Sequence, residues 1–463
     1  MFFESAEKKA KAFFARCPAS PEASDIRGVS LSYSSNIQSL MRNNRRDFLK
    51  KSSLAGFGVM SGNLLDLHAN PQPINPILPV NPNQELNLIG AYGPWAKSLN
   101  LEKLPIQSYR NPAITNLHAW RESTRKLVAE RMGTVDLGPI PQVTIHRTGT
   151  YEGVAFEEIS YQLSSGNPTK AVILKPENAK GKLPAILGLH CHGGNKFLGL
   201  DKISRTKADI PSYVQEHHNT YYEGRAWANE AAKQGYVVMV HDAFAFGSRR
   251  VLLEDAPEKI RKGITDFSLN TEEQIDAYNS WASEHEHILA KSLFCAGTSW
   301  PAVFLAEDQM ALSILAARED VDSGKLGCAG LSGGGLRTVM LGGLDPRISC
   351  AVAVGFMTTW ADLLMYKSYT HTWMTYVPIL PQELDFPEIL GLRAPLPTLV
   401  LNDIEDQLFT LSEMEKADQI LKEVYTKANA SDRYKCTFHP GPHKFDKAMQ
   451  EEAFGWFDRW LKG

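Results

Sequence analysis

The chain is predicted to fold as an α/β protein with a mostly parallel sheet and helices on both of its faces. Short, nearly continuous apolar runs recur from residue 183 onward, as parallel strands buried on both faces require. Between them lie segments whose apolar residues recur every three or four positions, which is the helical period. This alternation favours a parallel sheet with helical connections.

The apolar runs and the helical segments can be placed by residue number. The apolar runs occupy residues 183–193, 236–242, 325–330, 348–355, 397–403 and 434–441. The helical segments occupy residues 222–235, 306–320, 411–430 and 448–463. Three connections, at 194–221, 243–300 and 356–395, are longer than such a sheet needs, and long connections usually carry function or build a cap.

Upstream of the parallel sheet the pattern differs. Residues 120–133 have helical spacing and end on a glycine, whereas 154–163 and 169–176 alternate as strands and suggest an antiparallel pair. We divide the chain into a leader with a signal peptide, a linker, an N-terminal helical extension and an α/β domain, at 1–69, 70–85, 86–149 and 150–463.

The composition limits the kinds of partner. Apolar residues make up 43% of the chain, charged residues 22%, and the formal net charge is −3, which is ordinary for a soluble globular protein. Binding to nucleic acid needs a basic excess, so no nucleic-acid partner is expected. The six cysteines form no CxxC pair, so neither a zinc ribbon nor a disulfide framework is predicted.

Residues 43–70 have the anatomy of a signal peptide, with a basic head, a mildly apolar middle and a small-residue exit at 67–69. RRDFLK at 45–50 resembles the core of twin-arginine export signals, and Met41 just before it is the expected start. The middle is too short and too weakly apolar for a stable membrane span. We therefore expect a periplasmic or secreted protein; the alternative is a chance Arg-Arg in a cytoplasmic leader.

The stretch AGLSGGGLR at 329–337 contains the motif GxSxG around Ser332, after a predicted strand and before a helical segment. In that setting the motif presents a nucleophile. The glycines leave room for a strained turn, and amides at the helix N-terminus can stabilise an oxyanion. Alternatively, Ser332 caps a helix or the turn cradles a phosphate, although no GxxxxGK or GxGxxG follows the first strand.

A serine nucleophile needs a base and an orienting acid. Asp406 and His443 follow it in that order, each just past a predicted strand, and we assign them these roles. Asp403 and Glu405 compete for the acid, but Asp406 lies farther beyond the strand, where such acids usually sit. His439 is the rival base, and it is more easily explained as a strand-end residue.

Two backbone amides must bind the oxyanion. Gly333, directly after the nucleophile, is expected to supply one. The loop His192-Gly193-Gly194 is expected to supply the second, with Gly193 and Gly194 as the expected donors, because glycines let an amide approach a ligand closely.

Two histidine pairs have spacing that suits metal ligands. They are His190 with His192 and His285 with His287. Neither pair has an evident third ligand, so no metal site is predicted.

Residues 150–463 resemble the α/β-hydrolase superfamily, in particular its dienelactone-hydrolase-like and acetyl-xylan-esterase-like members. HDAFAFGSRR at 241–250 is similar to their DxxGxGxR turn, and LHCHGGNK at 189–196 to their LHGHGG loop, with Cys191 in place of a glycine. Residues 316–335 are similar to their helix, turn and nucleophile elbow. The elbow lacks the GCSRxG form of glucuronoyl esterases, which argues against that branch.

The resemblance implies an α/β-hydrolase fold and hydrolysis of an ester through an acyl-enzyme, in which Ser332 attacks, His443 moves the proton and Asp406 orients His443. It implies no metal or organic cofactor, and a small-molecule or carbohydrate ester as substrate. The acyl and alcohol groups and the oligomeric state stay open. The alternatives are a prolyl-oligopeptidase-like peptidase, although no propeller-sized repeat precedes the domain, and a catalytically silent fold used for binding.

The connection 356–395 is rich in aromatic residues near its start. Aromatic faces suit sugar rings and many acyl groups. We expect Trp360, His371 and Trp373 to line the pocket entrance, with His192 also in contact with substrate. The alternative is that the aromatic residues pack this insertion onto the sheet.

Overall fold

The computed structural model describes residues 86–99 and 102–463, which belong to one compact unit, Pro82–Gly463. The leader, signal peptide and linker predicted within residues 1–85 lie outside the described residues.

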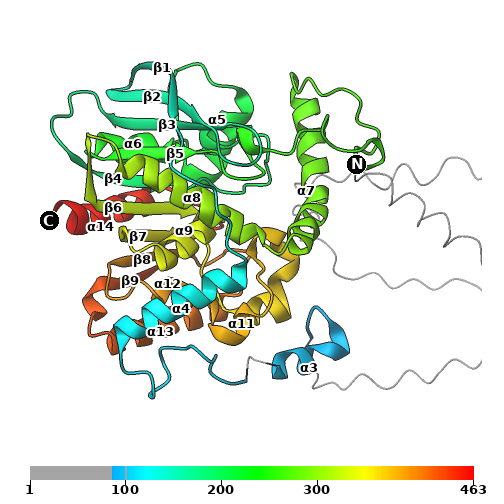
Figure 1. The fold of residues 1–463 in the computed structure, drawn as a ribbon, viewed down its shortest axis with the longest axis vertical. Helices are drawn as coiled ribbons and strands as arrows, with labels where there is room; N and C mark the ends of the chain where they lie inside the picture. Colours follow the sequence, from blue (N-terminus) through cyan, green and yellow to red (C-terminus); the bar gives the residue numbers. More distant parts are fainter. Residues whose placement is uncertain (1–85, 100–101) are drawn as a thin grey trace, which may run out of the picture. The chain divides into compact units, whose positions relative to one another are not determined.

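Nine strands in this described part form one sheet, in the order β1-β2-β3-β5-β4-β6-β7-β8-β9 (Figure 1). The strands are β1 (Val143–Tyr151), β2 (Val154–Tyr161), β3 (Thr169–Pro176), β4 (Leu183–Gly188), β5 (Val237–His241), β6 (Val321–Leu331), β7 (Ile348–Val354), β8 (Thr398–Asp403) and β9 (Tyr434–His439). β1, β2, β3 and β5 pair antiparallel, whereas β5, β4, β6, β7, β8 and β9 pair parallel. The predicted parallel sheet and antiparallel pair are both confirmed.

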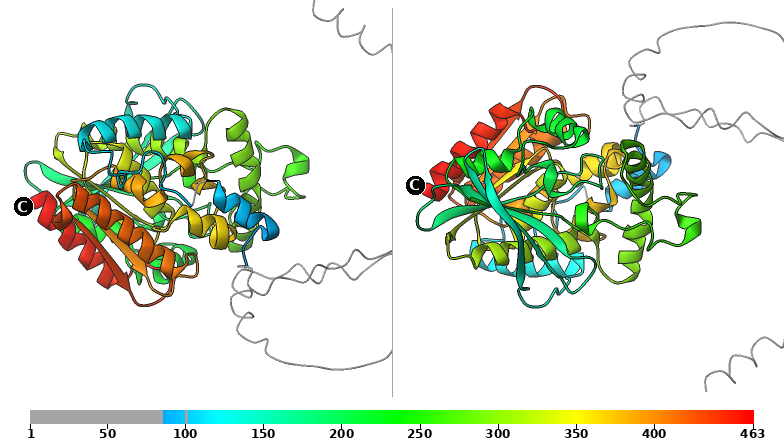
Figure 2. Two further views of the ribbon diagram at one scale, coloured as in Figure 1. Left: turned by 90° about the horizontal axis from the view of Figure 1, so that it is seen from below. Right: turned by 90° about the horizontal axis from the view of Figure 1, so that it is seen from above.

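Helices cover both faces of the sheet (Figure 2). One layer contains α4 (Leu117–Met132), α8 (Trp300–Ala316), α9 (Gly333–Leu344), α12 (Phe386–Gly391) and α13 (Leu411–Lys427). The other contains α5 (Ser212–Tyr222), α6 (Trp227–Lys233) and α14 (Lys447–Phe457). Neighbouring strand residues alternate between them: Leu187 and Cys328 face the first layer, and Ile186 and Ala329 face the second.

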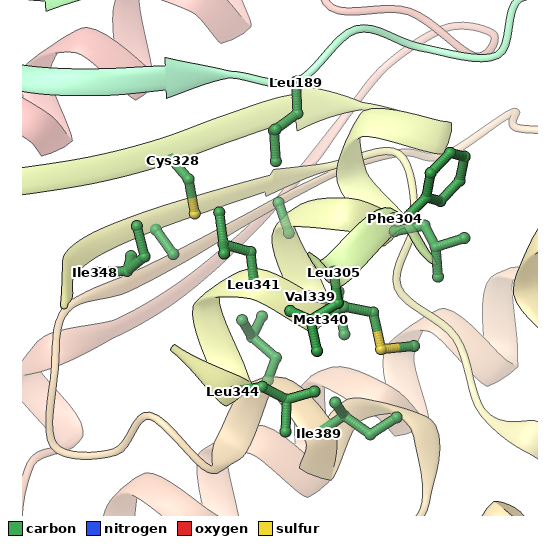
Figure 3. Close-up of a cluster of buried hydrophobic side chains, with 14 of the residues drawn as sticks. Leu189, Phe304, Leu305, Cys328, Val339, Met340, Leu341, Leu344, Ile348 and Ile389 are labelled. Carbon is green, nitrogen blue, oxygen red and sulfur yellow. The ribbon is translucent and has the colours of Figure 1, made fainter. Parts of the chain in front are cut away.

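The first layer fixes the position of α9, the helix that follows the predicted nucleophile. Figure 3 shows Leu341 and Leu344 of α9 between Cys328 of β6 and Ile389 of α12. Full burial of a leucine side chain contributes about 2 kcal/mol. The helix is therefore held against the sheet along most of its length.

Local signals set the ends of the longer helices. α4 begins after Asn116, whose side chain accepts a hydrogen bond from the amide three residues on, and ends at Gly133 with φ +78°. α7 (Glu272–Cys295) begins with a capping box formed by Thr271 and Gln274.

Two predicted boundaries are wrong. β1 begins at Val143, so the boundary at 149/150 falls inside a strand, and β6 begins at Val321 rather than at residue 325. β1 is an exposed edge strand with little apolar sequence, which is why its pattern was weak. The extension packs into the first layer through Trp120 and Val128 of α4, so it forms one unit with the α/β domain.

The long connections contain additional helices. The connection 243–300 holds α7 and a separate small hydrophobic cluster made of Leu253, Ala256, Tyr278, Trp281 and Ala282. The remaining α-helices are α3 (Gly93–Ser98), α10 (Trp360–Asp362) and α11 (Leu380–Glu383). Shorter 3-10 and π turns lie at Gly90–Tyr92, Leu200–Lys202, Gly247–Arg249, Glu258–Ile260, Leu363–Lys367, Ser368–Thr370, Trp373–Thr375, Ser431–Arg433 and Asp458–Lys462.

Within the described residues, no individual helix has the length and apolarity needed to cross a bilayer, and only the sharply bent pair of α7 and α8 meets those criteria when taken together.

Candidate active site

Ser332 occupies the sharp turn between β6 and α9. It has φ +84° and ψ −108°, which is a strained conformation for a residue other than glycine. Two backbone hydrogen bonds hold the turn: Ser332 N donates to Val354 O at 2.9 Å, and Leu336 N donates to Ser332 O at 2.8 Å. The strain therefore falls on the one residue that the sequence predicts to be the nucleophile.

The glycines around Ser332 are required by close backbone contacts. A Cβ atom added at Gly330 or Gly334 would lie 2.2 or 2.0 Å from Leu189 O, and one added at Gly335 would lie 2.4 Å from Val354 O. The expectation that larger residues would collide here is confirmed. The elbow fits between β4 and β7 only because these side chains are absent.

Asp406 and His443 come together at the ends of two neighbouring parallel strands. Asp406 follows β8 and His443 follows β9, and Asp406 Oδ2 lies 2.6 Å from His443 Nδ1. Burial of His443 opposes its charged form, but the charge and hydrogen bond of Asp406, with a further contribution from Asp403, outweigh burial and raise the pKa of His443. The pair is thus arranged to stabilise an imidazolium.

His443 also lies close to the nucleophile turn. A Cβ atom added at Gly355 would lie 2.9 Å from His443 Cε1. Gly355 directly follows Val354, whose carbonyl accepts the hydrogen bond from Ser332 N. The structure therefore brings the predicted serine, histidine and aspartate to one edge of the sheet.

The rivals for acid and base lie elsewhere or make other bonds. Asp403 Oδ2 accepts a hydrogen bond from Lys444 N at 3.0 Å, and Glu405 is exposed. His439 pairs with Glu452 through a 2.9 Å contact. Of the candidates considered, Asp406 is the one whose carboxylate bonds to His443.

Asp403 is nevertheless part of the site. It is completely buried, and its Oδ1 atom has no hydrogen-bond partner among the described residues. Burial raises the pKa of Asp403 to about 7. The ligand atoms of Asp403, Asp406 and His443 lie within 4.8 Å of one another, so the same group has the donor set and spacing to hold a divalent cation.

The amide nearest Gly333 belongs to His192. A Cβ atom added at Gly333 would lie 2.9 Å from His192 N. Gly194 N instead donates to His192 Nδ1 at 3.0 Å, and Gly193 packs against His217. The expected loop therefore lies beside Gly333, with His192 N next to it, while Gly194 N makes a hydrogen bond within the loop.

Two of the residues predicted to contact substrate, His192 and Trp360, make bonds within the protein instead. The ring nitrogens of His192 are both bonded within the protein, to Gly194 N and Glu286. Trp360 is only 4% exposed and donates its indole N–H to Leu384 O at 3.0 Å, which contradicts a place at the pocket entrance. Core packing, the alternative considered for this insertion, explains Trp360.

His371 and Trp373 differ in exposure. Trp373 is 39% exposed. His371 packs against Phe356 and Phe409, with ring centroids 5.3 and 4.7 Å away, and its Nε2 atom has no partner within the described chain. Burial lowers the pKa of His371, and the charges of Asp406 and His443 act on that pKa with opposite signs.

The histidine pairs weighed as metal ligands have other roles. His190 accepts a hydrogen bond from Ala243 N at 3.2 Å, and His285 stacks on Trp281 with ring centroids 4.7 Å apart. His190 and His192 are thus each committed to separate hydrogen bonds.

A buried polar group beside the loop at 189–199 was not predicted from the sequence. Glu286 of α7 contacts His192 at 2.8 Å and Lys196 at 2.6 Å. Lys196 is 2% exposed and Glu286 is 6% exposed. In the sequence, Lys196 and Glu286 are single charged residues in two different long connections. Their spacing along the chain does not predict that they come into contact.

These features define the class of fold. A serine elbow after a central parallel strand, followed along the chain by an aspartate and a histidine at the ends of later strands, is the arrangement of α/β-hydrolases. The chain has the α/β-hydrolase fold, with a mostly parallel nine-stranded sheet in the described residues.

Comparison with known proteins agrees with this fold. No family model matches the chain. The protein YtaP of Bacillus subtilis (strain 168), provisionally named as a hydrolase, is 24% identical over 343 residues, which are 74% of this chain and 100% of that protein.

Two solved structures are similar to it in fold. BF1801 of Bacteroides fragilis NCTC 9343, provisionally described as an acetyl xylan esterase, is 18% identical with a TM-score of 0.54, over 74% of this chain and 81% of that chain. A glucuronoyl esterase from Solibacter usitatus is 13% identical with a TM-score of 0.54, over 78% of this chain and 98% of that chain.

Proposed function

We propose that the protein is a serine carboxylesterase that acts on a small-molecule or carbohydrate ester. The observation that carries this proposal is the 2.6 Å contact between Asp406 Oδ2 and His443 Nδ1, next to a strained serine elbow. A solitary serine hydroxyl is a weak nucleophile, and an oriented histidine removes that limitation.

The proposed reaction has two halves. Ser332 Oγ attacks the acyl carbon while the free nitrogen of His443 takes the serine proton, and His443 then gives that proton to the departing alcohol. Water then gives a proton to the same nitrogen and attacks the acyl carbon, the bond from that carbon to Ser332 Oγ breaks, and His443 returns the proton to Ser332 Oγ as the acid leaves. Asp406 holds the proton on His443 Nδ1 and stabilises the imidazolium in both halves.

The amides of Gly333 and His192 are proposed to bind the oxyanion. They lie on neighbouring segments at the site, and Gly333 is the first residue of α9, where the helix dipole favours negative charge. Preorganised amides of this kind stabilise the charge that forms on the carbonyl oxygen.

The ester class is supported by the names of the proteins with the same fold, an acetyl xylan esterase and a glucuronoyl esterase.

Labelling with a fluorophosphonate tests the nucleophile directly. Wild-type protein should be labelled on Ser332, and Ser332→Ala should lose both labelling and hydrolysis of a short activated ester, by about 10⁴-fold or more. An unlabelled wild type would indicate a silent fold. A panel of acetylated sugars, simple esters and a prolyl peptide then separates an esterase from a peptidase.

We further propose that the protein is exported through a twin-arginine signal. The motif RRDFLK at 45–50 supports this proposal. Cell fractionation should find mature protein that begins near Asn70 outside the cytoplasm, and Arg45→Lys with Arg46→Lys should retain it inside. Wild-type protein with an intact N-terminus in the cytoplasm would refute export.

A further inference from the structure

The loop that carries His192 has no strand or helix of its own at the point where it meets the nucleophile elbow. It follows β4, and residues 189–199 form turns and bends. Backbone hydrogen bonds hold it at two points, from Leu189 N to Ala329 O at 2.8 Å and from Gly247 N to Lys196 O at 3.0 Å. Between these points the position of His192 N also depends on side-chain contacts.

One face of α7 holds the loop at two places. Asn279 Oδ1 accepts hydrogen bonds from Lys196 N at 2.9 Å and Phe197 N at 3.0 Å. Glu286 Oε1 contacts His192 Nε2 at 2.8 Å and Lys196 Nζ at 2.6 Å. Asn279 and Glu286 are two helical turns apart, so they project from the same side of the helix.

The hydrogen bonds fix both ends of the His192 ring. Gly194 N donates to His192 Nδ1, so the ring proton is on Nε2 and is donated to Glu286. Burial lowers the pKa of His192 to about 4, and the hydrogen bond from His192 and the charge of Lys196 lower the pKa of Glu286 to about 2 against the opposing effect of burial. The ring is neutral and cannot turn without breaking a charge-assisted bond.

Two buried lysines, Lys196 and Lys202, also hold the loop that carries His192. Lys196 Nζ lies 4.3 Å from the ring centroid of Phe246 and 5.0 Å from that of Trp300, and it balances the charge of Glu286. Lys202 Nζ donates to Cys191 O at 3.0 Å and to His192 O at 2.9 Å. Lys202 thus holds both the peptide group that contains His192 N and the peptide group that follows it.

We propose that α7 positions the oxyanion-binding amide of His192 through Glu286 and Asn279, so that Glu286 is a positioning residue for catalysis. This inference rests on the proposed function and assigns a role to the insertion at 243–300. The triad residues lie on other elements, so a change in α7 is expected to slow the chemical step and leave the nucleophile and base in place.

The test compares Glu286→Gln with Glu284→Gln. Both changes are on α7, but Glu284 is exposed and pairs with Lys262 at the surface, where an ion pair contributes little. The measurements are the rate of fluorophosphonate labelling of Ser332, and kcat and KM for an activated ester. Labelling builds negative charge on the phosphoryl oxygen, so it reports on the oxyanion amides without a known natural substrate.

Glu286→Gln should slow labelling and kcat by about 10- to 100-fold and leave KM within about threefold. Removing one oxyanion donor lowers kcat by about 10²- to 10³-fold, and a displaced donor should lower it by the same amount or less. Glu284→Gln should match wild type. Folded Glu286→Gln that is labelled at the wild-type rate, or that changes KM alone, would overturn the inference. If wild type itself is not labelled, the proposed serine esterase function is contradicted, and the role of Glu286 is not what has failed.

Asn279→Ala and Glu286→Asp keep the test decisive if Glu286→Gln does not fold. Asn279→Ala frees the amides of Lys196 and Phe197 and should give the same slow labelling with an unchanged KM. Glu286→Asp retains the charge and should fall between wild type and Glu286→Gln. Wild-type labelling rates in both folded variants would contradict the proposal.

Discussion

Asp406 Oδ2 and His443 Nδ1 are 2.6 Å apart, while the neighbouring Asp403 carboxylate bonds to the amide of Lys444. Two carboxylates thus share one environment but make different bonds. Asp406→Asn should lower kcat by about 10³- to 10⁴-fold, because the amide no longer holds the required tautomer. Asp403→Asn should stay within about tenfold of wild type. Steady-state kinetics on both variants checks this, and the opposite order would assign the acid to Asp403.

The pH dependence of the reaction should reflect the raised pKa of His443. The base acts only when it is neutral, so kcat/KM should fall as pH decreases through the pKa of His443. Asp406 and Asp403 raise that pKa above its ordinary value of 6.5, so the acid midpoint should lie above about 6.5. A pH profile of labelling measures it.

Asp403→Asn should move this midpoint slightly to lower pH. Asp403 has a pKa of about 7, so it carries part of a negative charge in this pH range, and that charge favours the imidazolium. Glu405→Gln is the matched control, because Glu405 is an exposed acid on the same loop, and its midpoint should equal that of wild type. A midpoint unaffected by Asp403→Asn would show that the Asp403 charge does not reach His443.

Asp403 should also make the stability of the fold depend on pH. Its folded-state pKa is about 7, above the value of about 3.9 in an unfolded chain. Between these values the folded state keeps a proton that the unfolded state has lost, so the free energy of unfolding falls as pH rises. The free energy of unfolding of Asp403→Asn, measured relative to that of wild type, should rise by on the order of 2 kcal/mol between about pH 5 and about pH 8. Urea unfolding at both pH values checks this, and a constant difference would contradict it.

The elbow should not tolerate Gly334→Ala. A Cβ atom there would lie 2.0 Å from Leu189 O, and moving a central strand away from α9 should cost more than about 3 kcal/mol. Gly455→Ala in α14 is the control, because nothing lies within 4 Å of its added Cβ atom, and it should stabilise the helix by about 0.5–1 kcal/mol. Thermal unfolding distinguishes the two, and equal melting temperatures would contradict the proposed clash.

Patterns that repeat along the chain could be predicted from the sequence. The parallel strands were visible as apolar runs because both faces are buried, and the elbow was visible because GLSGG combines a serine with glycines that the geometry requires. β1 was not predicted, since an exposed edge strand has no apolar face that produces a pattern.

Contacts between distant segments could not be predicted in the same way. The pair formed by Glu286 and His192 joins residues 94 positions apart, and either residue alone is typical of a polar surface. His192 N lies next to Gly333, while Gly194 N donates to the His192 ring. The sequence pattern does not predict a backbone turn of that kind.

The small hydrophobic cluster around Tyr278 and Trp281 belongs to the same helix that holds the oxyanion loop. Under the proposed role of α7, the loop at 189–199 and the insertion at 243–300 have to be transplanted together into another protein. A chimera that receives only one of them would keep Ser332, Asp406 and His443 but lose the contacts of Glu286 with His192 and Lys196. Directed evolution of turnover could then use α7 mutations that never touch the substrate.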